Sequence, residues 1–355
     1  MKEALLYEKL GDGKVRCGVC RWRCVIPDGG QGVCATRLNR GGVLHTLLYG
    51  RVASICADPI EKKPLYHFHP GTMVLSLGTV GCNFRCPGCQ NYEISQVCAK
   101  DRVAALHPIS PEESVELALA NACQGICWTY NEPAIWFEHT LESARLAKAR
   151  GLYTVYVTNG FISPEALDAI GPYLDAYRVD IKAFSREAYR KISGVARFEG
   201  ILESAVRARE HWGMHVECVT NVTPTVNDDP AMLREIACWI RDALGPHTPW
   251  HITRFFPYRE LSHLPPTPID LLEQAHAMAR EEGLAYAYLG NVAGHGGEDT
   301  HCHACGARVI QRRGMGVTAI ALEGGACHRC KTRIPGRFEG AQVSSGLRHP
   351  VRPPT

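Results

Sequence analysis

The sequence predicts an α/β protein whose centre is a partial, open β/α barrel. Strand-like and helix-like segments alternate about six or seven times through the middle of the chain, a pattern typical of parallel strands with right-handed crossovers. That number is too small for a closed barrel of eight units. Polar motifs follow the strand ends, where ligands bind in such folds. Groups of cysteines flank the alternating region on both sides, which predicts a small metal-binding segment at each end.

Apolar runs and helix-start signals set the expected elements. A capping box at residues 110–113 begins one helix, and Pro133 begins another that should end near Lys148, before Gly151. Further helices should begin at Ser163, Asp229 and Thr267, each followed by proline. The expected strands are 73–77, 125–130, 153–158, 176–183, 216–222, 250–255 and 284–289.

Four regions follow from this pattern. Residues 1–70 form an N-terminal cysteine-rich segment, 71–296 the barrel, and 297–338 a four-cysteine metal module. The tail, 339–355, is rich in Gly, Ser, Pro and Arg, so we expect it to be disordered.

The cysteine content is the informative part of the composition. Hydrophobic residues make up 45% of the 355, and the net charge of +3 is too small to indicate nucleic-acid or membrane binding. No apolar signal core or membrane-length run is present, so we expect a cytoplasmic protein, where thiols stay reduced. Most of the 17 cysteines fall into three tight groups, which favours metal binding over disulfides.

Three central cysteines, Cys82, Cys86 and Cys89, form a C-x3-C-x2-C pattern in the loop after the first barrel strand. Three thiolates on a [4Fe–4S] cluster leave one iron open, whereas a structural site normally has four ligands. A thioredoxin-like dithiol and a zinc site completed by a distant residue are the alternatives. The dithiol leaves Cys82 without a role, so the open cluster is the favoured interpretation, with these residues as catalytic metal ligands.

Polar side chains at later strand ends are candidate cofactor ligands. Asp180 and Lys182 alternate with apolar neighbours, so both should face the barrel interior. They either bind a zwitterionic ligand or form a structural ion pair. Asn131 and Glu132 begin a helix, where free N–H groups and a carboxylate can bind a ligand, or where Asn131 simply caps the helix. His251, on a later strand, is a weaker candidate because a lone histidine there is more often structural.

The outer cysteines form two closed four-thiolate groups. Cys302, Cys305, Cys327 and Cys330 have the spacing of a zinc ribbon or rubredoxin-type site, with zinc favoured over iron. Their role could be to stabilise a domain too small for a core of its own. At the N-terminal group, zinc and an auxiliary [4Fe–4S] cluster are nearly equal interpretations, with a slight preference for the cluster, and its ligands are Cys17, Cys20, Cys24 and Cys34.

The central triad resembles the signature of the radical S-adenosylmethionine (SAM) superfamily. More narrowly, the chain resembles the pyruvate formate-lyase activating enzyme-like branch and, within it, the radical SAM proteins of the AmmeMemoRadiSam system. This narrow resemblance covers nearly the whole chain, and besides the outer cysteines it is carried by segments 58–68, 81–95, 129–133 and 180–184.

The resemblance implies an enzyme of oxidoreductase type. SAM would bind the open iron, and an electron from the cluster would cleave it to methionine and a 5′-deoxyadenosyl radical that abstracts hydrogen from a substrate. The resemblance also implies SAM contacts near Asn131 and Glu132 (amino group), near Thr158-Asn159 (ribose), and at Asp180 and Lys182. This sequence departs from many relatives in two places. Gly88 stands where they have an aromatic residue near the adenine, and Val157 where cation-binding relatives have Asp.

The implied partners are a reductase, flavodoxin or ferredoxin as electron donor, and Memo-like and AMMECR-like proteins of the same system. A dedicated glycyl-radical activase is the alternative among enzymes. A zinc-stapled binding module is the alternative outside enzymes, but it explains only the outer cysteines. The sequence does not identify the substrate.

Overall fold

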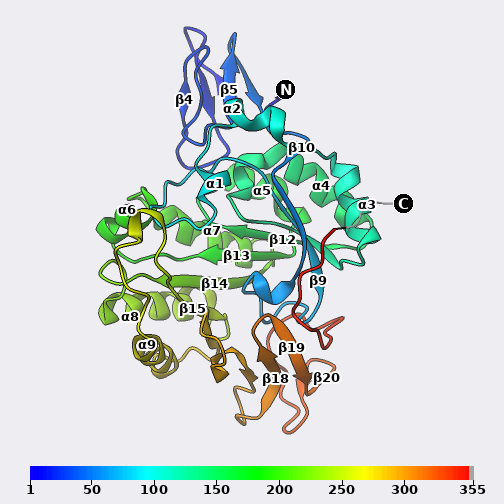
Figure 1. The fold of residues 1–355 in the computed structure, drawn as a ribbon, viewed down its shortest axis with the longest axis vertical. Coiled ribbons are helices and arrows are strands. Elements are labelled where there is room, and N and C mark those ends of the chain that lie inside the picture. The colour runs from blue at the N-terminus through cyan, green and yellow to red at the C-terminus, as the bar shows by residue number, and fades with distance from the viewer. Residues whose placement is uncertain (352–355) are drawn as a thin grey trace.

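The computed structural model describes residues 1–351 and centres on one curved eight-stranded sheet (Figure 1). Seven strands run parallel, and β8 pairs antiparallel with β9 at one edge. Within the described residues no pairing joins β16 to β8, so the predicted open α/β barrel is confirmed. The spatial order is β16 (Ala287–Gly290), β15 (Trp250–Arg254), β14 (His215–Val222), β13 (Ala176–Asp180), β12 (Tyr153–Thr158), β11 (Gly125–Trp128), β9 (Met73–Gly78) and β8 (Ser54–Pro59).

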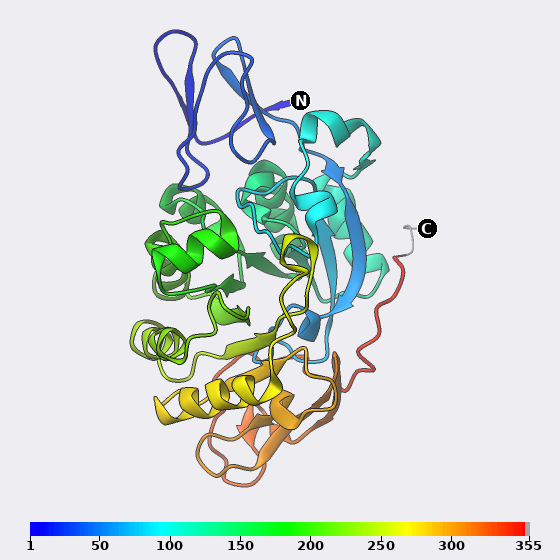
Figure 2. The ribbon, with the colours of Figure 1, turned by 60° about the vertical axis from the view of Figure 1, so that its left-hand side comes forward.

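The crossover helices cover the outer face of this sheet, as Figure 2 shows. Helices α3, α4, α7 and α9 pack directly on its strands and bury an apolar core between the two layers. The helices are α1 (Tyr92–Ser95), α2 (Ala99–Arg102), α3 (Pro111–Ala120), α4 (Phe137–Ala149), α5 (Pro164–Ile170), α6 (Arg186–Ser193), α7 (Glu199–Glu210), α8 (Pro230–Trp239) and α9 (Ile269–Glu281). No helix among residues 1–351 is long and apolar enough to cross a membrane.

Local signals explain most helix starts, with one difference. Ser110 and Glu113 form the predicted capping box of α3. After Pro133 the chain makes a short 3₁₀ turn, Pro133–Trp136, before α4. The side chain that caps this turn is Glu132, which accepts from the Ala134 N–H, and not Asn131. Four strands are shorter than expected: β11 ends at Trp128, β13 at Asp180 and β15 at Arg254, and β16 begins only at Ala287.

The N-terminal segment forms two small antiparallel sheets above the barrel in Figure 1. A buried ion pair joins the segment to α4, because Arg37 Nη2 lies 2.9 Å from both carboxylate oxygens of Glu138. A backbone bridge from Cys20 to Ile162 adds a second attachment. The strands are β1 (Lys2–Glu3), β6 (Val43–Thr46) and β5 (Arg37–Arg40) in one sheet, and β2 (Tyr7–Lys9), β3 (Val15–Cys17) and β4 (Val25–Ile26) in the other. A two-stranded sheet beside them joins β7 (Arg51–Val52) to β10 (His107–Pro108).

The C-terminal module lies at the opposite end of the molecule, at the bottom of Figure 1. Arg312 attaches it to the barrel, because Nη2 donates to the Tyr66 carbonyl at 2.7 Å and the guanidinium lies over the Tyr66 ring. Its strands are β17 (Thr300–His301), β18 (Arg308–Arg313), β19 (Gly316–Ile320), β20 (Leu322–Glu323) and β21 (Ala326–Cys327).

The tail takes a fixed path where the sequence predicts disorder. Over 339–351 it runs extended from the C-terminal module back along the sheet edge (Figure 1). The Ser344 N–H donates to the Val317 carbonyl, and the His349 N–H to the Ala57 carbonyl of β8. These bonds give the tail backbone partners on two structured elements, which composition does not reveal. Residues 352–355 lie outside the described part of the chain.

A buried carboxylate on β14 joins several segments beneath the barrel. Glu217 accepts hydrogen bonds from the backbone N–H groups of Tyr66 and His67 at 3.0 and 2.8 Å. It also pairs with the rings of His215 and His251 at 2.8 and 2.6 Å. Burial alone raises the pKa of Glu217, but the two histidine hydrogen bonds outweigh it and hold the pKa well below its usual range.

Replacing Glu217 with Gln should lower the free energy of unfolding at pH 7 by about 3–5 kcal/mol, because breaking a buried charged network leaves its partners uncompensated. The folded-state pKa is depressed, so this stabilisation is present above the ordinary glutamate value of about 4.3 and is lost as pH falls. Urea unfolding measured at several pH values should therefore show that the difference in free energy of unfolding between the unmutated protein and Glu217→Gln becomes smaller in acid. The exposed Glu187→Gln should cost less than about 1 kcal/mol at every pH. If Glu217→Gln and Glu187→Gln lowered the free energy of unfolding equally, the stabilising role given to the buried Glu217 carboxylate would be contradicted.

Candidate active site

The register of the parallel strands gathers the predicted residues at one edge of the sheet. Leu77 pairs with Trp128, Trp128 with Tyr156, and Thr158 with Val179, so the strands end at nearly the same level. The loops beyond these ends line a cavity of about 630 Å³. Nine of the predicted site residues line it: Cys82, Cys86, Cys89, Asn131, Glu132, Thr158, Asn159, Asp180 and Lys182.

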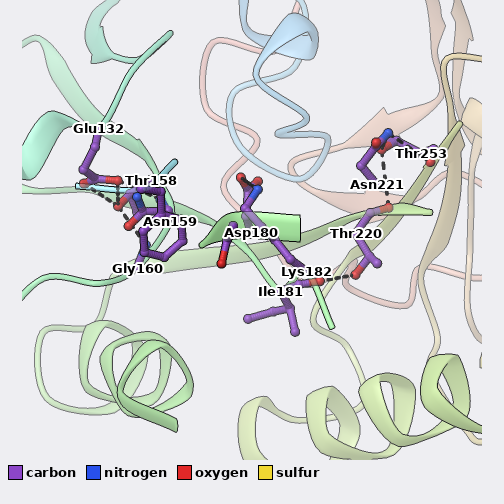
Figure 3. Close-up of polar contacts among 12 residues, drawn as sticks. Glu132, Thr158, Asn159, Gly160, Asp180, Ile181, Lys182, Thr220, Asn221 and Thr253 are labelled. Atoms are coloured by element: carbon purple, nitrogen blue, oxygen red, sulfur yellow. Dashed lines mark hydrogen bonds and ion pairs between the residues drawn. The ribbon is translucent and has the colours of Figure 1, made fainter. Parts of the chain in front are cut away.

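Glu132 organises one wall of the cavity, at the left of Figure 3. Its carboxylate accepts from Thr158 Oγ1 at 2.8 and 3.0 Å and from the Asn159 N–H at 2.8 Å. The carboxylate is buried, which raises its pKa to about 7 even though these donors favour the ionised form. Glu132 therefore fixes the loop after β12 and places a buried carboxyl group with a raised pKa in the wall of the cavity.

Asp180 and Lys182 share the inward side of the next strand end, as the alternation predicts (Figure 3). Lys182 Nζ donates to Asp180 Oδ2 at 2.8 Å, and Arg178 pairs with the other oxygen. Burial by itself lowers the pKa of Lys182, but the charge of Asp180, with a smaller contribution from Cys86 when it is ionised, outweighs burial and raises the pKa. Burial acts to raise the pKa of Asp180, and the two cations lower it below its usual value. Both groups are thus charged at neutral pH.

The three central cysteines face the same cavity. Cys82 Sγ accepts from the Phe84 N–H at 3.4 Å and Cys89 Sγ lies 3.2 Å from Ser95 Oγ, so two of the sulfurs have hydrogen-bonding partners. The buried Asn83 beside Cys82 has a side-chain nitrogen without a hydrogen-bond partner among the described residues. Three sulfurs that open on a cavity, together with a spare buried N–H donor, fit a sulfur-rich cluster with one open iron.

His251 is not brought to this cavity, contrary to the expectation that it contacts a cofactor. Its Nε2 pairs with Glu217, and its ring packs edge-on against Tyr66 with centroids 4.7 Å apart. Burial lowers the pKa of His251. The position of His251 therefore supports a structural role for this histidine beneath the barrel.

The C-terminal cysteines form a compact site. The sulfurs of Cys302 and Cys330 lie 3.5 Å apart, those of Cys305 and Cys327 lie 3.7 Å apart, and all four fall within 4.8 Å of one another. Four thiolates bound tetrahedrally at about 2.3 Å would be about 3.8 Å apart. The arrangement therefore fits a single ion and a zinc-ribbon-like module.

The N-terminal cysteines come together in another way. Cys17, Cys20, Cys24 and Cys34 line a second, small cavity inside the N-terminal segment. Among residues 1–351, the compact four-sulfur geometry of the C-terminal site is not repeated there.

The structure adds lining residues that sequence reasoning missed. Arg348 reaches the cavity from the tail, and Lys63 and Asn221 line it from the loop after β8 and from β14. Lys63 lies in segment 58–68, one of those that carry the family resemblance, so the resemblance could have indicated that Lys63 belongs to the site. Arg348 has none, because it follows a stretch without periodicity.

Comparison with known proteins identifies the class. The family model described as the radical SAM superfamily matches residues 76–237. Uncharacterized protein MJ0808 of Methanocaldococcus jannaschii is 43% identical over 336 residues, which cover 94% of this chain and 99% of that protein. The chain belongs to the radical SAM superfamily.

Two matching solved structures share less sequence identity with this chain. A domain of pyruvate-formate lyase-activating enzyme from Bacteroides vulgatus ATCC 8482 is 15% identical, with a TM-score of 0.42 over 47% of this chain and 99% of that one. Streptococcus suis SuiB is 10% identical, with a TM-score of 0.48 over 66% of this chain and 52% of its own.

Replacing Cys330 with Ser should remove about one metal equivalent per chain, because four thiolates at this spacing hold one ion. We expect the lost metal to be zinc, measured by elemental analysis after expression with balanced zinc and iron. Cys238→Ser, outside all three groups, should leave the metal content unchanged. Loss of a red, reversibly reducible iron would instead make this module a redox centre.

Proposed function

We propose that the cavity binds a [4Fe–4S] cluster at Cys82, Cys86 and Cys89 together with SAM, and that the protein cleaves SAM reductively to begin radical chemistry on a substrate. The observation that carries the proposal is the shared cavity. The three thiolates line one space with the charged Asp180–Lys182 pair and the buried Glu132. Superfamily membership supports the same general reaction. The cluster would supply one electron to the sulfonium of SAM, and the protein would hold and shield the reacting groups.

The residues of the cavity suit a zwitterionic cofactor. Lys182 offers a fixed ammonium for a carboxylate, because Asp180 holds it in place beside Cys86. Asp180 can accept from an ammonium or a hydroxyl group while it stays ionised. Glu132 acts first as a positioning residue, since both its oxygens already accept from the Thr158–Asn159 loop.

The finer assignments remain our proposals. A low-potential donor of the reductase, flavodoxin or ferredoxin class would deliver the electron that this reaction needs. Membership of the AmmeMemoRadiSam system, with Memo-like and AMMECR-like partners, rests on the sequence resemblance. The activase alternative rests on the same ground and stays a prediction.

Changing Cys82, Cys86 and Cys89 together to Ala should abolish reductant-dependent formation of 5′-deoxyadenosine, because no cluster remains to donate the electron. The assay is anaerobic reconstitution with iron and sulfide, then chromatography of the SAM products. Cys238→Ala is the matched control and should keep full activity. Undiminished cleavage by the triple variant would falsify the proposed site.

Replacing Lys182 with Ala should weaken SAM binding by about 1.5–3 kcal/mol, the usual contribution of a hydrogen bond to a charged group. Equilibrium binding to the reconstituted protein measures this, and circular dichroism reports whether the fold is intact. Lys191→Ala removes an exposed lysine that pairs with Glu187 and should leave SAM affinity unchanged. Normal affinity combined with reduced stability in Lys182→Ala would show that the pair with Asp180 is structural.

A further inference from the structure

The N-terminal cavity lies outside the proposed catalytic site and has the chemistry of a metal-cluster site. Its wall consists of the four cysteine sulfurs and mainly apolar side chains, which exclude water. Besides the four cysteines, the lining includes Trp22, Gly32 and Arg37. Three of the cysteines are buried and Cys24 is partly buried, and all four are free of disulfides.

The spacing of these sulfurs differs from that of the C-terminal site. One tetrahedral ion requires thiolates about 3.8 Å apart, as at Cys302–Cys330, but the N-terminal group falls outside that compact class among the described residues. The catalytic triad falls outside it too. A [4Fe–4S] cube gives each thiolate its own iron and therefore holds the sulfurs farther apart. Four cysteines that surround a cavity, outside the compact class, fit such a cube.

Gly32 keeps space open between two of the sulfurs. A Cβ atom at this position would lie 3.7 Å from Cys24 Sγ and 3.8 Å from Cys34 Sγ. Any larger side chain would compete with a cluster for that space.

A buried cation points to an anion in the cavity. The Arg37 side chain is 2% exposed and lines the cavity. Its Nη2 pairs with Glu138, but its Nε and Nη1 have no hydrogen-bond partner among the described residues. A buried guanidinium with two unused donors is costly unless another acceptor is present. The sulfurs of a cluster bound by four thiolates, which carries net negative charge, are such acceptors.

We propose that Cys17, Cys20, Cys24 and Cys34 hold a second [4Fe–4S] cluster, closed by four thiolates and neutralised in part by Arg37. This goes beyond the proposed SAM cleavage, because a cluster without an open iron cannot bind SAM and serves in electron transfer. The cluster exchanges one electron with a low-potential donor and changes only its own charge.

The second cluster lies beside the catalytic loop. A Cβ atom on Gly81, the residue before Cys82, would lie 2.8 Å from the Cys34 carbonyl oxygen, so these two backbone segments are in direct contact. Trp22 of the same segment donates its Nε1–H to the Asn83 carbonyl at 2.8 Å. The two cysteine groups are therefore linked through adjacent backbone, a placement suited to electron transfer between them.

Acid-labile sulfide distinguishes an iron–sulfur cluster from a zinc site, because zinc sites contain none. Variants at each cysteine group then show which cluster holds the sulfide. Reconstituted full-length protein should hold about eight sulfides per chain, and the Cys82→Ala/Cys86→Ala/Cys89→Ala variant about four. Adding Cys17→Ser and Cys20→Ser to that variant should remove the rest, whereas adding Cys238→Ser should not. About four sulfides in the unmutated protein and none in the triple variant, together with zinc at the N-terminal cysteines, would contradict the second cluster. The proposed catalytic cluster would be unaffected by that result.

Electron paramagnetic resonance tests whether four thiolates occupy all four irons of the second cluster. A redox titration of the same signal tests the role of Arg37. The reduced triple variant should give a cluster signal that SAM does not alter, and a SAM-dependent change would overturn the four-thiolate assignment. Adding Arg37→Gln/Glu138→Gln removes the buried pair without leaving one charge alone. A redox titration should then give a more negative potential, because Arg37 lines the cavity and Glu138 does not, so the loss of the nearer positive charge outweighs the loss of the negative one. An unchanged potential would overturn the role given to Arg37.

Discussion

Parallel pairing in register is the constraint on which the rest of the structure depends. Each crossover returns the chain to the same end of the sheet, so successive strands finish side by side. Residues about 25 positions apart in the chain, such as Glu132 and Thr158, thereby come within hydrogen-bonding distance. The open edges of the sheet leave room beside these strand ends for the cavity. No local property of any single motif creates that space.

Charged groups that are buried or partly buried are a second feature of the molecule, and those that join its segments have partners of opposite sign or several donors. Asp180 lies between two cations, Glu138 holds Arg37, and Glu217 collects two backbone N–H groups and two histidines. Such networks contribute little net stability compared with apolar packing, but breaking one is costly. They fix the positions of the loops that they join. Glu217 does this at the base of the barrel, and Glu132 does it at the cavity.

The three cysteine groups show how the same ligand type supports different chemistry. The C-terminal sulfurs are close enough for one ion, and small antiparallel strands hold them at the end of the molecule farthest from the N-terminal segment (Figure 1). The central three open on a cavity, so a ligand can reach what they bind. The N-terminal four enclose a space next to a buried arginine. Spacing between sulfurs, access and nearby charge distinguish the sites more clearly than cysteine number does.

The sequence by itself determined the open barrel, because alternating apolar runs and capping signals are local properties that survive folding. It also determined the triad, and the inward direction of Asp180 and Lys182, since strand alternation depends only on neighbouring residues. Only the tertiary structure decided that His251 turns to Glu217 instead of the cavity, and that the Asn131 side chain bonds the backbone of Thr79 and Gly81 instead of capping the helix start. It alone brought Arg348 from the tail to the cavity and Arg37 to the N-terminal cysteines. These outcomes depend on partners far away in the chain, and no local pattern specifies where such partners come to lie.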